Sequence, residues 1–258
     1  MVSQVEASVR RHAPGPVNGL LTRVLARQHI YVVYQPIVHL PDRTTVGYEA
    51  LARPVVDGGE GAETVEEFFG AAQRLGVIRD IDWLCRRAAV AGAQDLDDGV
   101  FLSLNVNSDL LSEPWLDVEV LLQVLEAEGR VPADTVLEIQ APDRPSGVDK
   151  LFEACQVYRD AGLRIALSGV NEGSSFALLP GPFDFIKLSR SVAAHLYERD
   201  VQAFISAAMD FAAREKVRLV VEGIEAEDVV TWLVAHNVEL GQGYYLGMPA
   251  PLEGANAR

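Results

Sequence analysis

The sequence predicts a single eight-stranded (β/α) barrel that follows an N-terminal helical segment. The chain has 258 residues, 49% of them hydrophobic, and one barrel of this kind usually takes about 250 residues. Short β-rich runs alternate with helical patterns from Tyr31 onward, which is typical of sheets whose strands are joined by helices. No low-complexity tract or Gly/Ser linker interrupts the alternation. We therefore expect a helical segment over residues 1–27 and the barrel over residues 28–258.

The elements before residue 55 set the direction of the first strand. Residues 2–27 have a helical pattern that Pro14 and Pro16 interrupt. Two β-rich runs follow at 31–38 and 45–54, and a short turn that begins at Pro41 separates them. Because so short a connection joins antiparallel neighbours, we expect the first strand to run against the others.

The remaining strands alternate with helices along the rest of the chain. In the first half we expect helices at 64–75 and 77–95, a strand at 100–105, helices within 110–128, a strand at 135–140 and a helix at 147–161. In the second half we expect a strand at 164–170, a short helix near 174–179, a strand at 184–189, a helix at 190–214, a strand at 217–224, a helix at 227–236 and a strand at 239–244. Together with the first two strands, these complete the barrel.

The acidic composition restricts the classes of partner. Acidic residues outnumber basic ones by 37 to 22, which gives a net charge of -15 at pH 7, and such a field repels phosphate backbones. We therefore expect no nucleic-acid binding, and a small anionic ligand would need a local Arg, Lys or metal ion. No apolar run reaches the roughly 20 residues that cross a bilayer, and no secretory signal pattern follows Arg10. We expect no membrane insertion and a cytoplasmic location.

Polar side chains recur at the carboxyl ends of the expected strands. Barrels of this class place their chemistry at that end. A lone buried Asn or Gln is commonly a satisfied structural group, but several polar residues at equivalent strand ends indicate a functional pocket. The residues of this set, each within an otherwise apolar run, are Glu49, Asn105, Glu138, Lys187, Glu222 and Gln242.

Several of these residues lie in motifs that resemble one known family. The segments Tyr34-Gln35-Pro-Ile-Val and Gly47-Tyr-Glu49-Ala-Leu-Ala-Arg53 are similar to the signature of EAL domains, bacterial cyclic di-GMP phosphodiesterases and their non-catalytic relatives. Further segments follow in the family's order: Leu102-Ser-Leu-Asn105, Leu137-Glu138-Ile, Phe185-Ile-Lys187-Leu, Val221-Glu222-Gly-Ile-Glu225 and Gly241-Gln242-Gly-Tyr244. The resemblance covers the chain from about Gln28 to its end and implies a TIM-like barrel of the EAL type.

The resemblance also implies roles for individual residues. Positions matching Glu49, Asn105 and Glu138 coordinate magnesium or manganese in active members, and their side-chain oxygens suit such ions. Lys187 and Glu222 match catalytic positions. The expected ligand-binding residues are Gln35, Leu51, Arg53, Glu225 and Gln242, with the Arg53 guanidinium suited to a phosphate of cyclic di-GMP.

The chain departs from active relatives at one strand end. Those relatives have two consecutive aspartates where this chain has Ser168 and Gly169, and neither a hydroxyl nor a hydrogen can replace a metal-binding carboxylate. A supporting glutamate of the family is Ala141 here. Glu172 lies four residues beyond Ser168, so it would reach the same metal only if the backbone folded back by several ångströms. These changes predict the loss of efficient hydrolysis.

We therefore predict a degenerate EAL domain without efficient catalysis that acts as a regulatory or signalling module, with cyclic di-GMP as its candidate ligand. Two alternatives remain open. One is a protein-interaction module whose partner, another protein or a second copy of this chain, binds regardless of nucleotide. The other is a weak metal-dependent phosphodiesterase that gives linear pGpG, with Mg or Mn at Glu49, Asn105 and Glu138.

Overall fold

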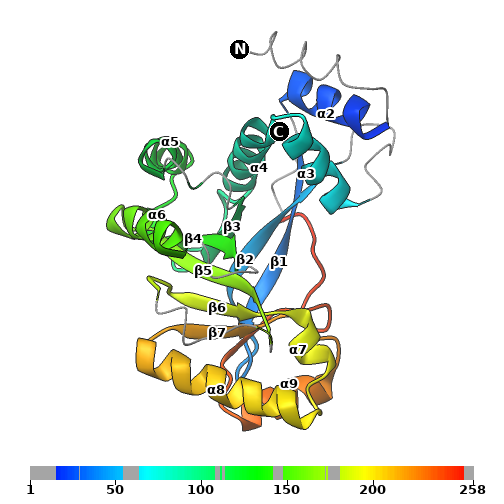
Figure 1. The fold of residues 1–258 in the computed structure, drawn as a ribbon, viewed down its shortest axis with the longest axis vertical. Helices are drawn as coiled ribbons and strands as arrows, with labels where there is room; N and C mark the ends of the chain where they lie inside the picture. The colour runs from blue at the N-terminus through cyan, green and yellow to red at the C-terminus, as the bar shows by residue number, and fades with distance from the viewer. Residues whose placement is uncertain are drawn as a thin grey trace. The chain divides into compact units, whose positions relative to one another are not determined.

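Eight strands close into a barrel in chain order, from β1 to β8, and Figure 1 labels the first seven of them. The computed structural model describes residues 16–28, 30–54, 64–107, 111, 114–141, 148–171, 173 and 181–252. The strands are β1 Tyr31–His39, β2 Thr44–Arg53, β3 Phe101–Val106, β4 Thr135–Gln140, β5 Arg164–Val170, β6 Phe185–Leu188, β7 Arg218–Val221 and β8 Leu240–Gly241. Strand β1 pairs antiparallel with β8, and β3 to β8 pair in parallel. The predicted barrel with an antiparallel first strand is confirmed.

The chain divides into two compact units. The first comprises residues 1–33, 50–95 and 251–258, and the second comprises residues 34–49 and 96–250. Strands β3 to β8 belong wholly to the second unit, and β1 and β2 each contribute residues to both.

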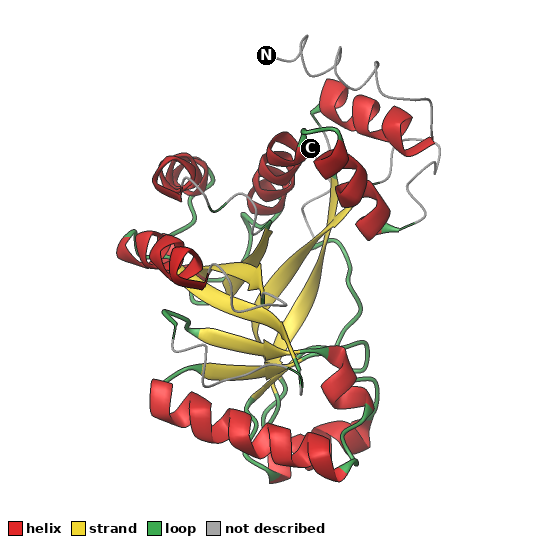
Figure 2. Cartoon of the chain, in the orientation of Figure 1, coloured by secondary structure: helices red, strands yellow, loops and turns green. Residues whose placement is uncertain are grey.

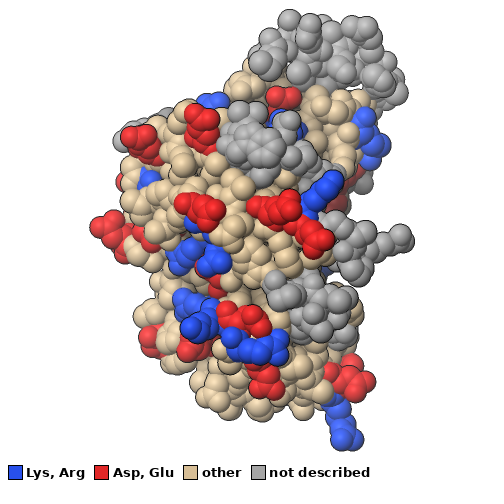
Figure 3. Space-filling model, turned by 60° about the vertical axis from the view of Figure 1, so that its left-hand side comes forward, with Lys and Arg blue, Asp and Glu red and all other residues tan. Residues whose placement is uncertain are grey.

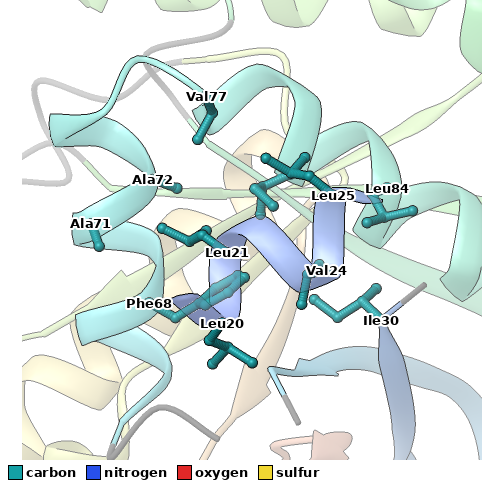
Figure 4. Packing of buried hydrophobic residues seen from close by; sticks show 11 residues of the cluster. Leu20, Leu21, Val24, Leu25, Ile30, Phe68, Ala71, Ala72, Val77 and Leu84 are labelled. Carbon is teal, nitrogen blue, oxygen red and sulfur yellow. The ribbon is translucent and has the colours of Figure 1, made fainter. Parts of the chain in front are cut away.

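The first unit has its own apolar core, built by three helices (Figure 4). These are α2 Pro16–Arg27, α3 Val65–Arg74 and α4 Ile78–Ala91. Helix α3 begins where Thr64 caps it, because the Thr64 hydroxyl accepts a hydrogen bond from the Glu67 amide at 3.0 Å. Full burial of each large apolar side chain contributes about 1.5–3 kcal/mol. The buried residues of this core are Leu20, Leu21, Val24, Leu25, Ile30, Phe68, Ala71, Ala72, Val77, Ile81 and Leu84.

The helices of the second unit follow their strands as predicted, with one exception. They are α5 Pro114–Ala127, α6 Val148–Asp160, α7 Arg190–Ala194, α8 Arg199–Glu215 and α9 Glu227–Ala235, with a 3-10 turn, η2, at Pro132–Asp134. The expected continuous helix over 190–214 was wrong, because the chain breaks into α7 and α8. Leu196 is fully buried at the break, and the extended Glu198 starts the new helix. The helical pattern of the sequence is therefore overridden where Leu196 is buried, as tertiary packing commonly overrides helix propensity.

Two strands are shorter than expected because glycines redirect the chain. The strand expected over 217–224 ends at Val221, and Gly223 then takes a positive φ of 74°, which favours glycine. The strand expected over 239–244 ends at Gly241, and a turn follows in which the Leu246 amide donates to the Gly243 carbonyl at 3.0 Å. The short helix expected near 174–179 and the helical pattern before residue 16 lie outside the described residues.

The charged side chains are dispersed over the face of the molecule shown in Figure 3. There, among the residues that the structure describes, Asp and Glu side chains lie between Lys and Arg side chains. Helix α8 lies along the side of the barrel where β7 is found (Figure 2). None of the helices in the described part of the chain has both the length and the apolar character that a membrane crossing requires.

One layer of apolar side chains fills the barrel in the second unit, on the side of the amino-terminal ends of the parallel strands. It consists of Ile37, Phe101, Val136, Ala166, Phe185, Val220 and Leu240, and we call it the apolar layer. The Phe101 and Phe185 rings contact each other with centroids 5.1 Å apart. Gly47 of β2 lies beside them, and a Cβ added there would come within 2.5 Å of the Phe101 ring. Position 47 therefore accepts no side chain while Phe101 fills this space.

The crowding at Gly47 predicts a loss of stability on adding one methyl group. Gly47→Ala should lower the free energy of unfolding by about 1–3 kcal/mol, since the Phe101 ring must move in a packed core. Gly70→Ala is the matched control, because its new methyl group meets only the end of the Arg74 side chain, at 3.4 Å, in a helix where Ala is favoured. Urea unfolding of both variants measures the difference, and equal stabilities would contradict the packing described here.

Candidate functional site

A layer of polar side chains lies next to the apolar layer in the second unit, on the side of the carboxyl ends of the parallel strands. Side chains two residues apart on a strand point to the same side, so one step of two residues from Val136 leads to Glu138 and from Phe185 to Lys187. Strand β1 is antiparallel to the other strands, so on β1 the same step goes to a lower residue number, from Ile37 to Gln35. This polar layer consists of Gln35, Glu49, Ser103, Glu138, Ser168, Lys187, Glu222 and Gln242; all are buried except the half-buried Glu222.

The Lys187 ammonium is the centre of the polar layer. Its Nζ lies 2.8 Å from Glu49 Oε2, 2.7 Å from Glu138 Oε2 and 2.9 Å from Glu222 Oε1. The side chain is 2% exposed, and so deeply buried a cation requires negative partners. One lysine on β6 thus binds carboxylates from β2, from β4 and from the segment that follows β7.

Amide side chains extend this network from Glu49. Asn105 Nδ2 donates to Glu49 Oε1 at 2.9 Å, and Gln242 Nε2 donates to Glu49 Oε2 at 2.9 Å and to Gln35 Oε1 at 3.2 Å. Gln35 Nε2 in turn donates to the Gly247 carbonyl at 3.2 Å. Both ends of the Gln35 amide therefore take part in contacts within the protein.

The buried charges shift one another's pKa values. Burial alone would lower the pKa of Lys187, but the charges of Glu138, Glu222 and Glu49 raise it well above its ordinary value. Burial and the neighbouring charge of Glu49 raise the pKa of Glu138 to about 7. Burial also acts to raise the pKa of Glu49, but Lys187 and the amide donors outweigh it and lower that pKa. Of Glu49 and Glu138, Glu138 is therefore the carboxyl group that more readily holds a proton.

The donor set fits a divalent cation. One carboxylate oxygen from each of Glu49, Glu138 and Glu222 lies within 4.8 Å of the others, and carboxylate and amide oxygens are the ligands that Mg²⁺ and Mn²⁺ take. The side-chain oxygen of Gln242, which is buried, has no hydrogen-bond partner in the described structure. This atom is a hydrogen-bond acceptor that a bound water or ligand donor would satisfy.

Strand β5 contributes no acid to the polar layer. Ser168 Oγ donates to the Ile139 carbonyl at 3.4 Å, so it faces the backbone of β4. Gly169 takes a positive φ of 74° where the pairing of β5 with β6 shifts register. A Cβ added to Gly169 would lie 1.8 Å from Gln140 Nε2. The Gln140 amide thus occupies the space that a side chain at position 169 would need.

The other residues predicted to bind a ligand lie elsewhere on their elements. Leu51 and Arg53 are half-buried residues near the end of β2 and belong to the first compact unit. Arg53 Nη1 donates to the neighbouring Ala52 carbonyl at 3.1 Å. Glu225 is exposed in the segment between β7 and α9. Their roles in ligand binding stay predictions.

Two contributors to this site were missed from the sequence. Ser103 Oγ donates to Glu138 Oε2 at 3.0 Å, and Gln140 closes the space beside Gly169. The available signal was strand periodicity, because Ser103 precedes Asn105 by two residues and Gln140 follows Glu138 by two. Glu172, the candidate substitute acid, lies outside the described residues.

Comparisons of the sequence identify one family. The EAL domain model matches residues 19–249. The chain is 28% identical over 244 residues to the probable cyclic di-GMP phosphodiesterase PdeB of Escherichia coli, covering 90% of this chain and 45% of that protein. It is 27% identical over 247 residues to the cyclic di-GMP phosphodiesterase NbdA of Pseudomonas aeruginosa, covering 90% and 30%. An uncharacterized signaling protein of Caulobacter vibrioides is 28% identical over 240 residues, covering 90% and 29%. The chain spans less than half the length of these relatives.

Solved structures share the fold. The EAL domain of FimX from Pseudomonas aeruginosa, bound to cyclic di-GMP, has a TM-score of 0.81 and 22% identity, covering 95% of this chain and 100% of that one. The PaMucR phosphodiesterase in complex with cyclic di-GMP has a TM-score of 0.80 and 23% identity, covering 92% and 98%. These likenesses support the barrel architecture described above.

The ion pairs of Lys187 predict that the folded protein depends on this one side chain. Lys187→Met should lower the free energy of unfolding by about 3–5 kcal/mol, because it leaves several buried carboxylates without their cation. Arg214→Met is the control, since Arg214 is exposed and its ion pair with Glu215 lies at the surface, where such pairs contribute about 0–1 kcal/mol. Chemical denaturation compares the two, and equally small losses would refute the central role of Lys187.

Because the Gln140 amide fills the space beside Gly169, we predict that the stability effects of substitutions at positions 169 and 140 are coupled. Gly169→Ala should cost about 1–3 kcal/mol of stability, because the added methyl group meets the Gln140 amide and the φ is positive. Gly129→Ala is the control for backbone strain alone, since Gly129 has a φ of 69° and no atom within 4 Å of the added Cβ. In a Gln140→Ala background the two substitutions should cost the same. A cost at 169 that Gln140→Ala leaves unchanged would contradict the contact.

Proposed function

Because the chain belongs to the EAL domain family, we propose that it is a signalling module that recognises cyclic di-GMP and does not hydrolyse it efficiently. Membership of this family supports the choice of ligand, as does the similarity to the cyclic di-GMP phosphodiesterase NbdA and the probable cyclic di-GMP phosphodiesterase PdeB. Since the chain spans only part of those proteins, its role in signalling is part of the proposal.

The observation that carries the proposal is the one-sided distribution of acids around the polar layer. Glu49, Glu138 and Glu222 gather around Lys187, whereas β5 presents Ser168 and Gly169. The Ser168 hydroxyl is hydrogen-bonded to a backbone carbonyl. Gly169 has no side chain, and the Gln140 amide fills the space where one would lie. Neither residue adds an anionic ligand. Two-metal hydrolysis of a phosphodiester needs both ions held in fixed positions about 4 Å apart.

The retained residues support binding of a single cation. Glu49, Glu138 and Asn105 would hold Mg²⁺ or Mn²⁺, with Glu222 beside them, and the ion would polarise a phosphoryl oxygen when bound. The protein itself orients these ligands, because Lys187 and Gln242 fix the Glu49 carboxylate. Asn105 fixes its other oxygen. The carboxylates are therefore preorganised, which is a requirement of a binding site as well as of a catalytic one.

Recognition of a doubly charged nucleotide depends on cations against a net charge of -15. Lys187 already makes three ion pairs inside the barrel, so its charge is largely used within the protein. Arg53 makes a single described hydrogen bond, to a backbone carbonyl, and a guanidinium binds phosphate through paired hydrogen bonds. We therefore assign the phosphate contact to Arg53.

A second candidate function is slow hydrolysis to pGpG. The cluster of three carboxylates within 4.8 Å favours it, because such a cluster is the kind of site that a catalytic divalent ion uses. The missing acids of β5 disfavour it. Slow turnover and simple binding differ in their product, and one experiment separates them.

We expect cyclic di-GMP to bind in the presence of EDTA and to remain intact with manganese. Isothermal titration should give a saturable signal that Arg53→Ala weakens at least about tenfold, which is the loss of one charge-assisted pair. Arg74→Ala, on the exposed end of α3, should bind like the wild type. Binding that is absent with and without metal would overturn the proposal and favour a nucleotide-independent interaction module.

Product analysis under single-turnover conditions completes this test. The protein in excess over cyclic di-GMP, with manganese, should release no linear pGpG beyond the level of a Glu49→Ala variant. Formation of pGpG that depends on Glu49 would show the second candidate function to be correct.

A further inference from the structure

Ser103 is the one hydroxyl of the polar layer that contacts a carboxylate among the described residues. It lies in the middle of β3 between Leu102 and Leu104, which point to the opposite side of the sheet. Its side chain is 1% exposed, and its hydroxyl donates to Glu138 Oε2 at 3.0 Å. A buried hydroxyl is unfavourable unless it is hydrogen-bonded, whereas Ala would fill this position without that cost. The bond to Glu138 is therefore what the hydroxyl provides.

Two donors from different strands converge on one oxygen of Glu138. Lys187 Nζ on β6 lies 2.7 Å from Oε2, and Ser103 Oγ on β3 lies 3.0 Å from the same atom. In the pairing of β3 with β4, Glu138 stands opposite Asn105 and Val136 stands opposite Ser103. Ser103 thus contacts Glu138 diagonally across the pair of strands, from the position opposite Val136. Two donors on Oε2 fix the plane of the carboxylate and give Oε1 one defined direction.

We propose that Ser103 is a positioning residue that holds the Glu138 carboxylate in the orientation needed to bind a divalent cation. This inference rests on the proposed function, in which Glu138 is one of the metal ligands. Ser103 itself touches neither the cation nor the nucleotide. It acts through Glu138, as hydrogen-bonding partners of metal ligands generally do, and removal of such a partner costs about 10–100-fold in metal affinity.

The distinction between positioning and packing sets the choice of variants. Ser103→Ala removes the hydroxyl and keeps the small size of the side chain, while Lys187 remains bound to Oε2. Ser103→Thr keeps a hydroxyl on Cβ and adds a methyl group. The matched control is Thr135→Val on β4, because Thr135 is fully buried and its hydroxyl donates to the Val131 carbonyl at 3.3 Å, away from the carboxylates.

The experiment is a titration of the whole chain with Mn²⁺, followed by the electron paramagnetic resonance signal of the free ion. We expect Ser103→Ala to raise the dissociation constant at least tenfold, Ser103→Thr to restore it to within about threefold, and Thr135→Val to leave it unchanged. Thermal unfolding in EDTA, run in parallel, should give similar midpoints for Ser103→Ala and Thr135→Val, since each loses one buried hydrogen bond.

The outcomes separate this inference from the proposed function. If the wild type binds Mn²⁺ and Ser103→Ala binds it equally well, the role of Ser103 is refuted and the metal site stands. If Ser103→Ala and Ser103→Thr lose affinity equally, packing and not the hydroxyl is responsible, and the inference again fails. If the wild type does not bind Mn²⁺, the positioning role of Ser103 is refuted, whether or not cyclic di-GMP binds. The proposed function fails as well only if the wild type also does not bind cyclic di-GMP.

Discussion

The site depends on one buried ammonium group placed among three carboxylates. Carboxylates that leave water lose a large hydration energy, and they stay ionised inside a protein only with compensating partners. Lys187 provides that compensation for Glu49, Glu138 and Glu222 within 2.9 Å. Because these acids come from β2, from β4 and from the segment after β7, the same group also ties separate strands together. Lys187 therefore both compensates the buried negative charge and connects the strands that carry it.

The period of the strands explains why the polar groups meet at one depth. Alternate residues face the barrel interior, so the apolar layer is followed, two residues further along each strand, by the polar layer. Gly47 leaves room for the Phe101 ring in the apolar layer, and Glu49 on the same strand then enters the polar layer. Because the residues of the apolar layer are all buried, the charges next to them lie beside apolar side chains, where charges interact more strongly than in water.

Sequence reasoning found the strands and most of the polar layer for a clear physical reason. A charged residue such as Glu138 or Lys187 within an apolar strand is conspicuous, because burying it without a partner is costly. Ser103 was missed because serine is unremarkable in a strand, and its partner on β4 is distant in the sequence. The break between α7 and α8 was missed because the helical pattern is continuous there, while the burial of Leu196 is a tertiary effect.

Strand β5 differs from its neighbours in what it contributes to the polar layer. Ser168 is buried in the polar layer, but its hydroxyl bonds to the backbone of β4, and Gly169 takes a left-handed conformation against the Gln140 amide. A carboxylate at position 169 would require a new backbone conformation as well as a new side chain. The acids around Lys187 need no such change, because their hydrogen bonds already fix them. The carboxylates of β2, β4 and the segment after β7 are therefore held in place by hydrogen bonds that do not involve β5.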